Sequence, residues 1–123
     1  MQQHIINLTP HDVVVGEPHP GGGWREVKRY PPSGFVARVS FEDARVDEIN
    51  GVPLYEIKFG EPHLLDGKGN SHPFPEPRSG VYYIVSGRLK SALPERDDLL
   101  VPHTGRAYRD ETGRIVAVPG FTR

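Results

Sequence analysis

The sequence predicts an α+β fold, in which a mostly antiparallel β sheet or half-barrel carries one short helix. Gly and Pro, with 14 and 13 residues, make up about a fifth of the 123 residues, which is typical of short strands joined by tight turns. Short apolar or alternating stretches recur along the chain and indicate strands. A helical spacing of apolar residues is found at Leu89, Ala92 and Leu93, and it predicts the short helix.

The first third of the chain is predicted to consist of strands and turns. His4 to Leu8 and Asp12 to Gly16 are expected strands, and the second contains three consecutive valines. His19 to Gly23 is expected to be a hairpin loop, followed by a half-buried edge strand from Trp24 to Tyr30. After a turn, the alternation from Phe35 to Phe41 predicts a strand with one face on the core.

The next hairpin is centred on Asn50-Gly51. This pair readily takes the two positive φ values that a type I′ turn requires. It joins two predicted strands, Ala44 to Ile49 and Val52 to Phe59. The residues of this hairpin that are expected to point inward are Tyr55, Ile57 and Phe59.

Residues 60–80 have a different composition, with four prolines and four glycines and almost no periodicity. They are predicted to form a long Pro/Gly-rich surface loop within a single domain that covers residues 1–123. Loops of this length are uncommon in compact domains and are often functional or disordered. A tolerated insertion without a role is the alternative.

The last third of the chain is organised around the run Val81 to Val85, which predicts a strand covered on both faces. Ser86 and Gly87 end this run and lead into the short helix, which Pro94 stops. Asp98 to Val101 is expected to be a short strand. A final hairpin is expected around Asp110 to Gly113.

Composition excludes several classes of protein. The net charge of −1 and the pI of about 6.6 provide no basic field for a nucleic-acid backbone, so nucleic-acid binding is not expected. The absence of Cys excludes disulfides and Cys-ligated zinc. No apolar run approaches the roughly 20 residues of a spanning helix, and the start of the chain does not resemble a signal peptide, so no membrane association is expected.

The junction between strand and helix is the candidate binding site. A helix start presents unpaired N–H groups that suit a phosphate or carboxylate. Ser86 and Gly87 would direct the anion, and nearby cations would supply charge. The predicted ligand-binding residues are Ser86, Gly87, Arg88, Arg96, His103 and Arg106. The alternative is that Ser86 only caps the helix and that the arginines are solvated or paired with Asp97 and Asp98.

Catalytic and metal-binding signatures are weak. The histidines are scattered without metal-ligand spacing, so neither a metal nor another cofactor is expected. His103 with Asp97 or Asp98 is the one grouping suited to acid–base chemistry. No nucleophile elbow and no Cys nucleophile supports acyl transfer. An enzymatic role is therefore less favoured than binding.

Several stretches together carry a resemblance to known proteins. They are INLTPH at Ile6 to His11, PPSG and ARV within Pro31 to Val39, the segment Tyr83 to Gly105, and RDETGRIVAV at Arg109 to Val118. On these stretches the chain resembles a group of small proteins encoded by tailed phages and prophages, often of actinobacteria. The resemblance implies a phage setting and a site of action in the host cytoplasm, and it supplies no catalytic residues.

The expected function is that of a non-enzymatic phage accessory protein. It would bind a small anionic, nucleotide-like ligand and sequester a signal of host anti-phage defence. A homo-oligomer is expected, because pockets between subunits enclose ligands that a small monomer cannot. Two alternatives stay open: a structural or assembly protein of the virion, and a small phosphodiesterase that uses His103 and Asp97 or Asp98.

Overall fold

The computed structural model describes residues 3–123. The strands in the first half are β1 (His4–Asn7), β2 (Val13–Pro18), β3 (Trp24–Tyr30), β4 (Val36–Arg38), β5 (Phe41–Ile49) and β6 (Val52–Phe59). Those in the second half are β7 (His63–Leu65), β8 (Ser71–Pro73), β9 (Val81–Ile84), β10 (Leu99–Pro102), β11 (Tyr108–Arg109), β12 (Ile115–Ala117) and β13 (Phe121–Thr122). The helix α1 spans Gly87–Ala92, and a 3₁₀ turn, η1, spans Thr104–Arg106.

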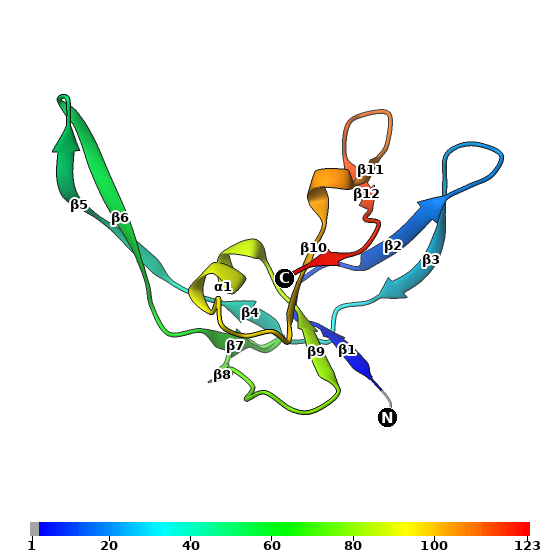
Figure 1. The fold of residues 1–123 in the computed structure, drawn as a ribbon. Helices are drawn as coiled ribbons and strands as arrows, with labels where there is room; N and C mark the ends of the chain where they lie inside the picture. Colours follow the sequence, from blue (N-terminus) through cyan, green and yellow to red (C-terminus); the bar gives the residue numbers. More distant parts are fainter. Residues whose placement is uncertain (1–2) are drawn as a thin grey trace.

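The centre of the molecule is a four-stranded sheet with the order β1-β9-β10-β13. The strand predicted from the run Val81 to Val85 is β9, and its central place in the sheet is confirmed (Figure 1). β9 pairs in parallel with both β1 and β10, whereas β10 and β13 are antiparallel. Parallel neighbours need long connections, which run here through the hairpins and through α1.

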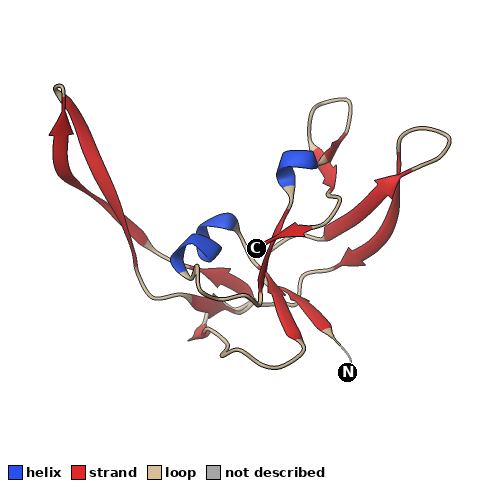
Figure 2. Ribbon diagram, in the orientation of Figure 1, coloured by secondary structure: helices blue, strands red, loops and turns tan. Residues whose placement is uncertain are grey.

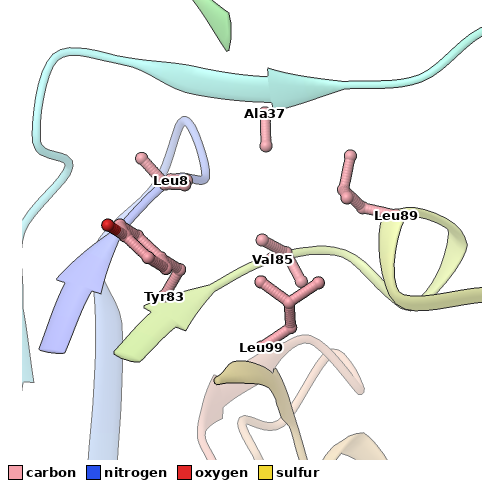
Figure 3. Packing of buried hydrophobic residues seen from close by; sticks show 6 residues of the cluster. All are labelled: Leu8, Ala37, Tyr83, Val85, Leu89 and Leu99. Atoms are coloured by element: carbon pink, nitrogen blue, oxygen red, sulfur yellow. The ribbon is translucent and has the colours of Figure 1, made fainter. Parts of the chain in front are cut away.

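The main core lies on one face of this sheet. Tyr83 and Val85 point to this face from β9 and its end, and Leu89 of α1 packs beside them (Figure 3). The complete buried set of this cluster is Leu8, Ala37, Tyr83, Val85, Leu89 and Leu99. The helix is short, and burial of Leu89, which is fully shielded from solvent, holds it to the sheet.

A second, smaller core lies on the opposite face. Ile84 alternates with Tyr83 and Val85 and packs with Val13 and Val118. The backbone joins the same segments, because the Gly16 N–H donates to the Val118 carbonyl at 2.9 Å. The stretch from Tyr83 to Val85, at the end of strand β9, is therefore covered on both faces, as its apolar run predicted, whereas Val81 and Tyr82 are half-buried.

Two-stranded hairpins project from this centre (Figures 1 and 2). The longest is the β5–β6 hairpin, residues 41–59, which we call the arm. Its turn matches the sequence prediction, since φ is 52° at Asn50 and 81° at Gly51. Every residue of β5 and β6 is exposed. The expectation that Tyr55, Ile57 and Phe59 point inward is therefore wrong: the arm leaves the body, and these three side chains are exposed.

Two further predictions need correction. The alternating segment Phe35 to Phe41 is not one strand: β4 is limited to Val36–Arg38, and Phe41 already belongs to the arm. Residues 60–80 are not all loop, because β7 pairs with both β4 and β8 in a three-stranded sheet with the order β4-β7-β8. The sequence did not predict this sheet because the segment is rich in proline, which cannot donate a hydrogen bond to a neighbouring strand. Proline is tolerated here because Pro73 closes β8, an edge strand.

The fold is rich in β structure with one short α-helix in the described part of the chain. Its strands form several small, mainly antiparallel sheets around the central one, and residues 3–123 contain no closed barrel. No helix within these residues is long and apolar enough to cross a bilayer.

Candidate functional site

Ser86 acts as the N-cap of α1. Its backbone is extended, with φ −69° and ψ 158°, and its Oγ accepts a hydrogen bond from the Leu89 N–H at 3.2 Å. This bond satisfies one of the free donors at the helix start. The helix that follows from Gly87 has only six residues. Ser86 thus has a structural partner within the chain.

Arg88 contacts the base of the arm. Its Cζ atom lies 3.9 Å from the centroid of the Phe41 ring, within the range of a cation–π interaction. Phe41 is the first residue of β5. The arginine therefore connects α1 to the point at which the arm leaves the body.

Arg96 is held by Asp98. Arg96 Nε donates to Asp98 Oδ1 at 2.8 Å, and Nη2 donates to Oδ2 at 2.7 Å, a bidentate pair whose side chains are only 14% and 13% exposed. Hydrogen bonding to Arg96 lowers the pKa of Asp98 below its ordinary value, and the same bonds raise the pKa of Arg96. The charge of Arg96 is thus largely compensated within the chain.

His103 and Arg106 lie elsewhere. His103 directly precedes η1 and Arg106 is its last residue, and the Arg106 N–H donates to the His103 carbonyl at 3.4 Å. In Figure 1, η1 is drawn in orange beside the β11–β12 hairpin and well apart from α1. Within residues 3–123, no hydrogen bond, ion pair or ring contact links this pair to Arg88 or Arg96. The six predicted residues therefore occupy three places: the helix start, the Arg96–Asp98 pair and the η1 turn.

Arg96 lines a hollow that we call the proline hollow, with a volume of about 660 Å³. Its wall is formed mainly by β7, β8 and the residues after them. The charged or polar lining residues are Glu61, His63, Ser71, His72, Glu76 and Arg96. The two carboxylates make this hollow unfavourable for an anion. No group of three or more His, Cys, Asp or Glu side chains suited to a metal ion occurs among the described residues.

A second hollow, of similar volume, was not predicted from the sequence, and we call it the basic groove. Its floor is formed by half-buried apolar and aromatic side chains, and its rim carries the Lys28 and Arg123 side chains but no Asp or Glu side chain. The lining residues are Gln3, Ile5, Lys28, Tyr30, Tyr82, Leu100 and Arg123. One signal in the sequence pointed here: Tyr82 must face away from Tyr83, and so away from the main core.

The arm is the other surface that sequence reasoning missed. Its large apolar side chains are between 37% and 64% exposed. They are Phe41, Val46, Ile49, Val52, Leu54, Tyr55, Ile57 and Phe59. Alternation along β6 predicted a core-facing strand, but alternation is the same for any sheet face that becomes buried, whether by its own chain or by another.

Acidic residues surround these apolar side chains. The arm contains five carboxylates and two cations, which are Glu42, Asp43, Asp47, Glu48, Glu56, Arg45 and Lys58. Because strand partners face the same side, Phe41, Ile57 and Phe59 share one face at the base of the arm, while Ile49, Val52 and Leu54 share the other face toward its tip.

No protein-family model, no curated protein and no solved structure matches this chain.

Proposed function

We propose that this chain is a structural or assembly protein of a phage particle, which binds neighbouring protein subunits through its arm. The observation that carries the proposal is the arm itself: a hairpin of nine and eight residues per strand, exposed throughout and rich in apolar side chains. The phage setting comes from the sequence resemblance described above.

An isolated two-stranded hairpin is at best marginally stable in water. Contiguous exposed apolar surface on a protein marks an interaction site. A long hairpin that adds nothing to the core of its own chain is thus best explained by burial against another protein. A hairpin of this length reaches beyond the body that carries it, so it is placed to contact a neighbouring subunit.

Ligand sequestration at the helix start has less support from the geometry. An anion there would compete with the cap bond between Ser86 and Leu89, and Arg96 is already paired with Asp98. A phosphodiesterase is likewise less supported, because the Asp98 carboxylate is bound to Arg96 and no described contact joins Asp97 or Asp98 to His103.

The test is to purify intact particles from cells that carry the phage or prophage encoding this chain, and to quantify its peptides by mass spectrometry. The expected result is a fixed copy number per particle, or particles that fail to mature when the chain is deleted. The arm variant Tyr55→Lys/Ile57→Lys is expected to abolish incorporation or maturation, because it places charge on an apolar binding face.

The matched control is Ile115→Lys, which changes an exposed apolar residue on the β11–β12 hairpin instead of the arm. This control should behave like the wild type. If deletion leaves normal particles and the chain is found free in the cytoplasm with a retained anionic ligand, the proposal fails and sequestration becomes the leading explanation.

A further inference from the structure

We infer that the arm of one copy of this chain docks into the basic groove of a second copy, giving a directional, head-to-tail contact. The inference rests on the proposed structural role and deepens it by naming the partner. It is built from the shape of the groove, the charges on both surfaces and the direction in which the arm leaves the body.

The groove is an uncovered part of the central sheet. Ile5 lies beside Tyr82 in the register of β1 and β9, and Leu100 lies beside Ile84 on the same face. Farther along this face, Ile84 is fully buried among Val13, Val118 and the half-buried side chains that pack against them. Ile5, Tyr82 and Leu100 stay half-buried because the chain's own cover ends before it reaches them. An apolar floor is therefore available to side chains such as Ile57 and Tyr55.

Charge complementarity selects this groove over the other hollow. The arm is acidic, with five carboxylates against two cations. The basic groove presents the Lys28 and Arg123 side chains and is lined by no Asp or Glu side chain, whereas the proline hollow presents Glu61 and Glu76. Like charges that meet across an interface are unfavourable, so the proline hollow would repel the arm.

The arm does not fill the groove of its own chain. It projects from the side of the molecule that holds α1 and β4, while β1 and β3, which border the groove, lie on the other side (Figure 1). The donor surface and the acceptor surface are thus different parts of the chain. Contacts of this kind are heterologous, and they produce a closed ring where the rotation closes and a filament where it does not.

The test uses two variants with opposite defects. The arm variant is Tyr55→Lys/Ile57→Lys, and the groove variant is Lys28→Glu/Arg123→Glu. All four positions are exposed or on the rim, so both variants are expected to fold, which circular dichroism checks. By light scattering coupled to size-exclusion chromatography, we expect the wild type to form oligomers above the dimer and each variant alone to be monomeric.

The decisive sample is an equimolar mixture of the two variants. The groove variant still has an intact arm, and the arm variant still has an intact groove, so one productive contact remains. We expect a dimer of one copy of each and nothing larger. The control is Arg25→Glu, a charge reversal on the same strand as Lys28 but outside the groove, which should assemble as the wild type does.

A wild type that stays monomeric at high concentration overturns the inference, as does a groove variant that still assembles alone. Failure to form the mixed dimer from two folded variants also overturns it. These results can be distinguished from a failure of the proposed function. If the chain is monomeric by itself but is still incorporated into particles, the structural role stands, and the arm binds a different subunit.

Discussion

At the scale of single residues, Asn7 shows how a polar side chain organises a turn. Its side chain is 2% exposed, yet every hydrogen-bonding group on it has a partner. Nδ2 donates to the carbonyls of His11 and Tyr30, both at 2.8 Å, while Oδ1 accepts from the N–H and the hydroxyl of Thr9. The stretch from Ile6 to His11, which contributes to the phage resemblance, thus has a structural explanation at this position.

We predict that Asn7→Ala destabilises the protein by about 2–3 kcal/mol, because the buried Asn7 side chain makes four hydrogen bonds and the carbonyls of His11 and Tyr30 both lose its amide donor. Chemical denaturation of the two proteins measures the difference. Thr9→Val is the matched control, since it removes only the hydroxyl and leaves the Thr9 N–H bond to Asn7. A cost for Asn7→Ala no greater than that for Thr9→Val would contradict the role assigned to this side chain.

Arg96 is a second residue whose role differs from the one expected. The sequence suggested an exposed cation available to a ligand, but the side chain is mostly buried against Asp98 and lies 5.4 Å over the Phe74 ring. We predict that Arg96→Ala costs about 1–3 kcal/mol of stability, because the Asp98 carboxylate loses its charged partner. Thermal unfolding measures this loss, and Arg88→Ala, at a surface contact, should cost clearly less.

The ion pair between Arg96 and Asp98 predicts that the stability of the fold depends on pH. The pKa of Asp98 is lowered in the folded protein, so this pair stabilises the fold above the ordinary pKa of Asp, and the contribution is lost as pH falls through the lowered value. The difference in free energy of unfolding between the wild type and Asp98→Asn should therefore become smaller as the pH is lowered below about 4. Equal gaps at pH 7 and in strong acid would show that the carboxylate does not carry this stabilisation.

At the scale of elements, the arm and the body have separate sources of stability. The body has buried clusters on both faces of its sheet, whereas the arm is held by its own ladder of hydrogen bonds, its turn and the contact between Arg88 and Phe41. Opening of the arm thus costs less than global unfolding. A destabilising substitution in the arm should therefore lower the local stability of β5 and β6 and leave the stability of the body unchanged.

We predict that Gly51→Val weakens the arm by roughly 1 kcal/mol or more, because a β-branched residue resists the φ of 81° at this position. Hydrogen exchange of monomeric protein should show about fivefold or greater loss of protection in β5 and β6, since 1.4 kcal/mol corresponds to tenfold. Protection in β9 should not change. Equal losses in the arm and in β9 would mean that the two unfold together.

At the scale of the whole molecule, the apolar surface is distributed between a buried centre and a projecting, exposed hairpin. The proposed head-to-tail contact would cover this hairpin and so stabilise it. The prediction of a single domain over residues 1–123 stays a prediction, and so does the prediction of a homo-oligomer, for which the head-to-tail contact supplies a specific geometry.

We predict that assembly weakens as salt rises, because an acidic arm meets a basic rim. Raising NaCl from 0.05 to 0.5 M should increase the dissociation constant about threefold to tenfold, as expected for a few partly exposed charge pairs. Analytical ultracentrifugation measures the change. Lys28→Gln should flatten this dependence, and assembly that strengthens steadily with salt would indicate that charge plays no part.

The sequence by itself determined the local structure wherever neighbouring residues decide the conformation. The strand from Val81 and the positive-φ turn at Asn50-Gly51 follow from residue type and short-range sterics, and both were predicted. The cap at Ser86 has the same local origin, and it was the alternative to the predicted role of Ser86 in ligand binding. The tertiary structure alone decided three other matters: the parallel pairing of β9 with β1 and β10, the separation of the six predicted site residues, and the exposure of the arm. Periodicity reports that one face of a strand becomes buried, but it carries no information on which chain buries it. For this reason the sequence predicted Tyr55 and Ile57 to be core residues, whereas in the structure they form an exposed surface.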